Sequence, residues 1–427
     1  MILLALFFLF LLILITRVVK FNIISPIYIY LMFYIIALGL SVPYYYYFDD
    51  KVSLYNFDFI TTEQFDLTVT YHLIALIAFC IGVLFYYDFS RAKTKLLLNK
   101  SFVKSLFINP NIQVNILPAI HVIMLIIILF CGLTYGKQIF YRELYLVEGN
   151  RTLITLFKLL SFVATLMLAV VFRKHKAIAL FYFIIIMLIG IGTGSRLAFV
   201  YLAVYALLIY QTSKNTTKDK MILVLNITLS FVFLSFLMTL RKLPDHGILP
   251  YVSSVFNNSK AVGDSIVFNT YYSFIFGVFV SAKTLMENIP DWNNIVVAVN
   301  PVTGNMAGWY EIAPNMRLNR FAPMSANGEV FTMGKTFTFI FFTVIGVVFT
   351  YFETQMRKFF KNKKRVIGFI IALLSILFVA MSFEYNLRST MRYIYYITFV
   401  IVVAGYLSRY SFKIGLVSIP KNSKVET

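Results

Sequence analysis

Long apolar runs separated by short basic stretches make up most of the chain. A membrane-spanning helix needs about 20 mostly apolar residues, and the pattern predicts eleven such helices. Several are short, and two of them have almost no connection between them, so that this pair could instead form a broken or re-entrant element. The predicted spans are 1–16, 27–48, 67–87, 114–135, 153–172, 177–192, 197–211, 221–240, 336–354, 366–383 and 394–409.

Composition supports a membrane protein. Of 427 residues, 60% are hydrophobic and 13% are charged, and the mean hydropathy is +0.81. Soluble domains carry about 25% charged residues, so lipid is the expected solvent. We expect an all-α integral membrane protein with three parts. These are a first bundle of eight spans at 1–240, a long extracytoplasmic loop at 241–335, and three last helices with a cytoplasmic tail at 336–427.

The basic residues predict the orientation of the chain. The formal net charge is +20, but the charges fall between apolar runs, which argues against nucleic-acid binding. With eleven spans, all the larger basic stretches fall on one side, and that side is expected to be cytoplasmic. The N-terminus is then outside the cytoplasm and the C-terminus inside. The stretches are 17–20, 91–104, 173–176, 214–220, 357–365 and 409–424.

The long loop contains one ambiguous segment, 264–287, which is nearly apolar enough to span. A twelfth span would move Lys361, Lys363 and Lys364 outside, so we interpret the segment as an interfacial or re-entrant helix. The loop is rich in aromatic residues, and Trp and Tyr favour the headgroup region. We expect a small folded cap that lies on the membrane.

A glycine-rich turn at 192–196 is the first candidate for chemistry. Glycines allow close approach of a ligand to the backbone, and a following helix N-terminus favours an anion. Arg196 adds a cation with a geometry suited to phosphate. The alternative is a plain tight turn with an interfacial arginine.

Further arginines map at or near the outer interface, where the positive-inside rule does not explain them. Each alone could be a surface or snorkelling residue, but as a set they predict a basic pocket for a diphosphate. Glu329 and Glu384 lie closest to them in sequence and are the candidate general bases, with a salt bridge as the alternative role. Glu384, Arg388 and Arg392 would share one face if their helix continued outward. The candidate arginines are Arg196, Arg241, Arg317, Arg320, Arg388 and Arg392.

The chain offers no pattern for a metal or nucleotide. No histidine or acidic pair has metal-ligand spacing, and there is no phosphate-binding Gly-Lys-Ser/Thr loop. We therefore expect no cofactor, and an activated lipid or an ion gradient as the energy source.

This architecture resembles the bacterial oligosaccharide repeat-unit polymerases, the O-antigen polymerase family of the Wzy type. The resemblance rests on the number of spans, the long outer loop before the last spans and the outer arginines. The turn ending in Gly194-Ser195-Arg196 is similar to a turn in that family, and Arg317 with Gly328 after ten residues matches its arginine–ten–glycine pattern.

The resemblance implies a metal-independent glycosyltransferase of the GT-C type in the bacterial inner membrane. It would transfer a glycan from undecaprenyl diphosphate to another lipid-linked repeat unit, forming O-antigen, capsule or a related polysaccharide. Its expected partners are the lipid-linked oligosaccharide and membrane lipids, and a chain-length regulator is a further candidate.

Two other functions stay open. An O-antigen ligase acts on the same carrier, but ligases resemble one another in using a loop histidine, and here only His246 lies in the long loop, at its start. A flippase or transporter should place charges in midplane cavities, whereas most ionisable residues outside the cytoplasmic stretches lie at the outer edge, with Lys158 as the main exception.

Overall fold

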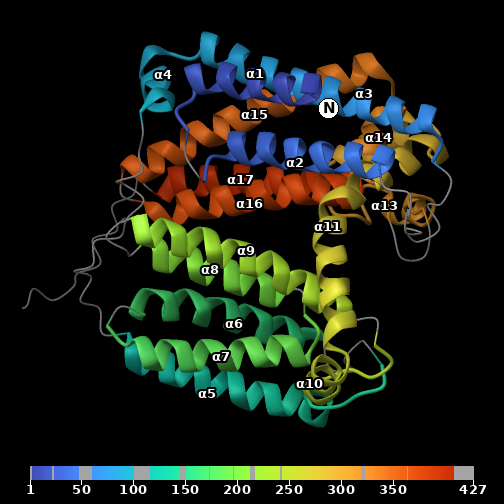
Figure 1. Cartoon of the computed structure of the whole chain (residues 1–427). Coiled ribbons are helices and arrows are strands. Elements are labelled where there is room, and N and C mark those ends of the chain that lie inside the picture. The colour runs from blue at the N-terminus through green and yellow to red at the C-terminus, as the bar shows by residue number, and fades with distance from the viewer. Residues whose placement is uncertain are drawn as a thin grey trace, which may run out of the picture. The chain divides into compact units, whose positions relative to one another are not determined.

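The described part of the chain is helical, as predicted (Figure 1). Besides helices and turns it contains two isolated β-bridges, Arg142–His246 and Arg317–Pro323. The computed structural model describes residues 2–21, 24–47, 60–100, 116–144, 151–172, 174–195, 197–211, 217–240, 243–318, 323–362 and 364–407.

Each predicted span coincides with one helix, to within a few residues at most ends. The largest differences are in α3, α15 and α17, which extend beyond the predicted apolar runs into polar sequence. The corresponding helices are α1 Ile2–Val18, α2 Pro26–Tyr47, α3 Thr62–Phe89, α5 Leu117–Thr134, α6 Arg151–Val171, α7 Lys176–Gly192, α8 Leu197–Gln211, α9 Thr217–Leu240, α15 Lys335–Lys361, α16 Arg365–Glu384 and α17 Leu387–Leu407.

Among the described residues, seven helices are long and apolar enough to cross a membrane, and a bent pair within α11 (Ser259–Glu287) makes a possible eighth span. The seven are α2, α3, α5, α6, α9, α15 and α16. By the same test α1, α7 and α8 are shorter apolar helices. The multi-pass character is therefore supported, and the count of eleven spans stays a prediction.

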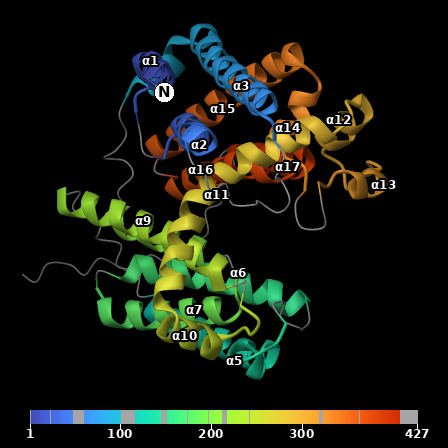
Figure 2. The same ribbon diagram turned by 45° about the vertical axis from the view of Figure 1, so that its right-hand side comes forward.

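The ambiguous segment 264–287 lies within α11. This helix bends by 57° between Val262–Asn269 and Phe274–Glu287 (Figure 2). A bend of this size fits either a broken span or a re-entrant element, so the expectation that the segment does not cross stays a prediction.

The chain forms two compact units that are not contiguous in sequence. Unit 1 comprises Met1–Ala5, Ile35–Phe59 and Ser101–Phe279, and unit 2 comprises Leu6–Tyr34, Ile60–Lys100 and Val280–Thr427. The boundary falls inside α11 and therefore within the long loop at 241–335, and the expectation of a cap on the membrane stays a prediction.

Unit 1 is built around the apolar faces of α5, α6, α7 and α8. Phe183 of α7 stacks on Tyr205 of α8 with ring centroids 3.9 Å apart. The two helices come close because Gly190 has no side chain: a Cβ there would lie 2.8 Å from the Cβ of Ala198. The shorter elements of this unit are η2 Gly136–Ile139 and α10 Ile248–Asn257.

Unit 2 depends on the contact between α3 and α15, which run side by side (Figures 1 and 2). Their backbones touch at two glycines. A Cβ on Gly82 would lie 2.1 Å from the Thr343 carbonyl oxygen, and one on Gly346 would lie 2.2 Å from that of Phe79. Small residues allow this close approach, which gives membrane helices much of their packing energy.

The shorter elements of unit 2 follow α3 and α11 in the chain. They are α4 Ala92–Asn99, α12 Trp292–Val299, α13 Trp309–Ile312, η3 Ala313–Asn315 and α14 Ala326–Thr332.

A buried ion pair on α15 ties together the ends of several helices in unit 2. Arg357 Nε lies 2.5 Å from Glu353 Oε1, and their side chains are 1% and 0% exposed. The other carboxylate oxygen of Glu353 accepts a hydrogen bond from Ser25 Oγ at 2.6 Å. The guanidinium also donates to carbonyl oxygens at the ends of α1 and α4, those of Lys20, Leu97, Leu98 and Lys100.

Replacing Gly346 by Ala should destabilise the protein, because the new methyl group cannot fit against the backbone of α3. Overpacking of this kind costs about 1–3 kcal/mol. We expect a lower midpoint in thermal unfolding followed by size-exclusion chromatography in detergent. Gly39→Ala is the matched control, since no atom lies within 4 Å of its added Cβ. Equal midpoints for the two variants would contradict the contact.

Replacing Arg357 by Met should destabilise more strongly, because it leaves the Glu353 carboxylate buried without its cation. Removing one partner of a buried pair costs about 3–5 kcal/mol. The double variant Glu353→Gln/Arg357→Met should recover part of the loss, because no unpaired charge remains. A double variant less stable than Arg357→Met, in the same unfolding assay, would argue against this explanation.

Candidate functional site

The candidate base Glu329 lies on α14, a short helix whose position is fixed by its N-cap and by one glycine. Ser325 caps the helix by accepting a hydrogen bond from the Gly328 N–H at 2.9 Å. The Ser325 N–H donates to Thr284 Oγ1 at 3.0 Å, which attaches α14 to the end of α11. A Cβ on Gly328 would lie 2.4 Å from the Cβ of Thr284. Gly328, the glycine of the arginine–ten–glycine pattern, is thus required here for packing.

The carboxylate of Glu329 is buried at the start of another helix. The residue is 1% exposed, and Oε1 accepts a hydrogen bond from the N–H of Leu387, the first residue of α17, at 3.2 Å. Oε2 has no hydrogen-bond partner among the described residues. Burial raises the pKa of Glu329 to about 8, and the Leu387 N–H lowers it by a smaller amount. A carboxyl with a pKa near the working pH is suited to accept or donate a proton.

The expected common face of Glu384, Arg388 and Arg392 is wrong in part, because the helix does not continue. α16 ends at Glu384, Tyr385 is extended, and Asn386 caps α17 by accepting from the Ser389 N–H at 2.9 Å. Only Arg388 and Arg392 therefore share a helix.

The break nevertheless brings three of the candidates to one place. The Tyr385 carbonyl accepts from the Ala326 N–H at 2.7 Å, so that α14 lies against the junction of α16 and α17. Glu329, Glu384 and Arg388 are all within a few residues of these contacts. Glu384 is half-buried at the last position of α16.

The buried side chain of Arg388 is hydrogen-bonded to backbone carbonyl groups. It is 3% exposed and its Cζ lies 5.6 Å from the centroid of the Trp309 ring. Its guanidinium donates at 2.5, 3.3 and 2.7 Å to the carbonyl oxygens of Val297, Asn300 and Val302. These bonds make Arg388 a positioning residue for the segment that contains α12 and α13, and direct diphosphate binding by it stays a prediction. Arg392, one turn further along α17, is exposed.

Arg317 is also exposed and lies before α14. A bridge from Arg317 to Pro323 and the Met324 N–H···O=C Met316 bond of 3.2 Å join the two described segments beside a core of Trp309, Met316 and Met324. Arg320 lies outside the described residues, as do Arg196 and Arg241.

The glycine-rich turn has a structural explanation in unit 1. Gly194 has φ +63°, its N–H donates to Ile191, and the Ser195 N–H donates to Gly190. This is a Schellman cap of α7, so the backbone N–H groups of 193–195 are not free to bind a phosphate, contrary to our expectation. Arg142 fixes the same turn by donating to the Gly192 carbonyl at 2.5 Å.

Sequence reasoning missed a buried polar group next to α14. Asn327, Tyr34, Tyr30 and His72 are 0–1% exposed, and each has a side-chain nitrogen or oxygen without a hydrogen-bond partner among the described residues. His72 stacks on Phe383, with centroids 5.4 Å apart. No local motif could have identified this group, because its members come from three separate parts of the chain.

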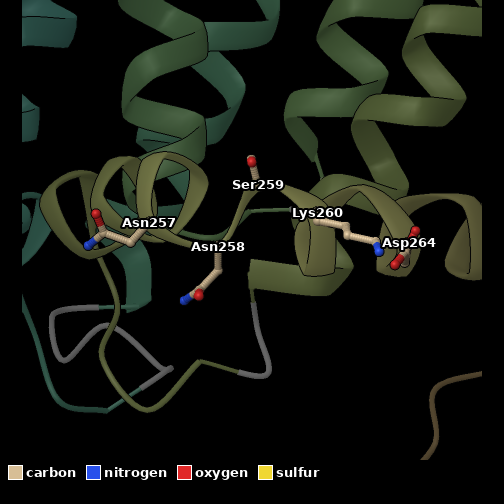
Figure 3. Close-up of a pocket in the computed structure, with 5 residues that line it drawn as sticks. All are labelled: Asn257, Asn258, Ser259, Lys260 and Asp264. Atoms are coloured by element: carbon tan, nitrogen blue, oxygen red, sulfur yellow. The ribbon is translucent and has the colours of Figure 1, made fainter.

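A separate pocket of about 400 Å³ occurs in unit 1, where α10 meets α11 (Figure 3). It contains none of the candidate arginines and neither Glu329 nor Glu384. Its lining residues are Asn257, Asn258, Ser259, Lys260 and Asp264.

Comparisons with protein-family models, curated proteins and solved structures find no match to this chain. The candidate site therefore has to be judged on its own geometry.

The raised pKa of Glu329 predicts a pH dependence of stability. In the unfolded chain the carboxyl ionises near its ordinary pKa of 4.5, whereas in the folded protein it keeps its proton up to about pH 8. Stability should therefore fall as the pH rises from about 5 to 8 and then level off.

Glu329→Gln should flatten this dependence when thermal midpoints are compared across that pH range. Glu311→Gln is the control, because Glu311 is exposed on α13. Parallel pH profiles for wild type and Glu329→Gln would show that Glu329 is not held protonated.

Proposed function

We propose that this protein is a membrane glycosyltransferase that polymerises undecaprenyl-diphosphate-linked oligosaccharide units at the extracytoplasmic face of the bacterial inner membrane. The observation that carries the proposal is the buried carboxyl of Glu329 at the N-terminus of α17, with Arg392 exposed on the first turns of the same helix. One group suits proton transfer and the other suits a diphosphate.

The reaction needs both kinds of group. The acceptor hydroxyl would give its proton to a carboxylate while its oxygen attacks the anomeric carbon of the donor. The bond between that carbon and the diphosphate oxygen breaks, and undecaprenyl diphosphate leaves with the electron pair. Arginines stabilise the charge that develops on the leaving group.

Roles can be assigned to the individual residues. Glu329 is the first candidate for the base, and the less buried Glu384 is the second. Arg317 and Arg392 are exposed cations of unit 2 with which the diphosphate would interact, and Arg320 belongs to the same part of the chain. Arg196 and Arg241 stay candidates from the sequence alone. Arg388 contributes by fixing α12 and α13, and any direct contact with diphosphate would have to be made in addition to its present bonds.

One observation favours a second function. His72, Tyr30 and Tyr34 are polar residues buried within the apolar helices α2 and α3, and polar groups inside a membrane bundle are typical of transporters. A flippase for lipid-linked oligosaccharide is therefore the second candidate. A ligase acting on a lipid A core is the third, and no structural observation favours it over the polymerase.

The deciding experiment uses purified protein in nanodiscs with synthetic undecaprenyl-diphosphate repeat units. We expect a ladder of longer lipid-linked glycans by gel electrophoresis. Product formed only after addition of lipid A core would indicate the ligase. Movement of the substrate across liposomes without any transfer would indicate the flippase, and either result would overturn the proposal.

Arg317→Ala, Arg392→Ala and Arg196→Ala should each abolish or strongly reduce the ladder at normal protein levels, because each removes positive charge from the proposed diphosphate site. Lys361→Ala is the matched control, since Lys361 is an exposed cation at the far end of α15. Wild-type ladders from both Arg317→Ala and Arg392→Ala would show that the diphosphate assignment is wrong.

A further inference from the structure

α12 is a short helix with one apolar face packed and one apolar face exposed. Ile295 and Ala298 are buried within unit 2, at 8% and 0% exposure, where α12 contacts α17. Trp292 and Val296, one turn apart, are 61% and 62% exposed, and Ile289 just before the helix is 79% exposed. A large exposed apolar face of this kind marks an interaction surface.

The exposed face of α12 continues into the outward-facing surface of a candidate span. The Trp292 ring contacts the ring of Phe337, edge to face, with centroids 5.1 Å apart. Phe337 is the third residue of α15, and further along this helix Ile340 and Val344 are 56% and 53% exposed. If α15 crosses the membrane, these side chains face lipid, and Trp292 lies beside the level at which the helix enters it.

The chemistry of the face fits the boundary between headgroups and acyl chains. Tryptophan is enriched there because its ring is apolar and its N–H is polar. The polar residues near the helix start suit the aqueous side: Asp291 caps α12 by accepting from the Asn293 N–H at 2.8 Å, and Asn293 is exposed. An apolar face beside polar residues is the pattern of a helix lying in the membrane surface.

We propose that α12 is an interfacial helix that inserts Trp292 and Val296 into one leaflet of the bilayer. The partner is the lipid surface itself. The inference does not depend on the reaction proposed above, because it requires only that α15 enters the membrane next to Trp292.

This contact would be connected to the candidate site. Arg388 binds carbonyl oxygens at the end of α12, and the N–H of the preceding residue Leu387 binds Glu329. A lipid-anchored α12 would therefore fix the depth at which the start of α17, and with it Glu329, lies in the membrane surface.

The two tryptophans of the chain allow a direct test. Trp292 is exposed and Trp309 is 9% exposed beneath Arg388. Trp309→Phe leaves Trp292 as the single tryptophan. In nanodiscs we expect lipids brominated near the top of the acyl chains to quench most of its emission. Lipids brominated at the chain ends should quench less, and aqueous iodide should have little effect.

Trp292→Phe is the control, because the remaining Trp309 is buried and should be quenched much less by brominated lipid. If Trp309→Phe does not fold, the difference between wild-type and Trp292→Phe spectra gives the Trp292 signal. Emission from Trp292 that iodide quenches and brominated lipid does not would overturn the proposal.

A second measurement tests the orientation of the helix. Val296→Cys and Asn293→Cys can be spin-labelled selectively, since the free cysteines Cys80 and Cys131 are buried. The label at Val296 should collide more with oxygen, which is enriched in lipid, and the label at Asn293 more with a water-soluble nickel complex. Equal, water-like accessibility at both positions would contradict insertion.

Discussion

The main chains of α3 and α15 touch at Gly82 and Gly346, and the arrangement of unit 2 depends on that contact. Each missing Cβ lets a carbonyl of the other helix approach to a distance that no side chain would allow. Because lipid provides no hydrophobic drive between helices, close packing of this kind has to hold them together. The pair then supports the aromatic cluster around Tyr30 and Phe79, whose rings stack at 3.8 Å.

Once α15 is fixed against α3, both of its ends have defined surroundings. At one end Arg357, which is paired with Glu353, donates hydrogen bonds to carbonyl groups at the ends of α1 and α4. At the other end α14 precedes α15 directly, and it places Glu329 under the first turn of α17. Burying a carboxyl there is unfavourable for the charged form, and the single N–H bond from Leu387 compensates only in part. Because Glu329 stays buried in the folded protein, its pKa lies close to neutral pH.

The sequence predicted the helices well because a membrane span is a property of local composition. It did not predict the buried ion pair of Arg357 with Glu353. We assigned Arg357 to a basic loop, because counts of charged residues cannot show that it is buried inside α15 beside a carboxylate. It placed the end of α16 correctly, since the predicted span stops at 383, but it did not predict that α17 begins as early as Leu387, because Arg388, Ser389 and Thr390 are polar and the spans were predicted from apolar runs. The turn at 192–195 shows the reverse problem: glycines that suggested a phosphate site serve as the cap of α7.

The arginines predicted to lie on the outer side were the main lead to function, and the structure separates them into two kinds. The positive-inside rule leaves them all unexplained, but Arg388 has a structural explanation, since it satisfies carbonyl groups that follow α12 and has Trp309 beneath it. Arg142 in unit 1 is explained in the same way by the Gly192 carbonyl. Among the described candidates Arg317 and Arg392 have no such bonds and are exposed. An arginine that stabilises the fold should lie buried against carbonyls, whereas one that binds a diphosphate must reach the surface. Arg317 and Arg392 are exposed, so they are the described arginines that remain candidates for binding a diphosphate.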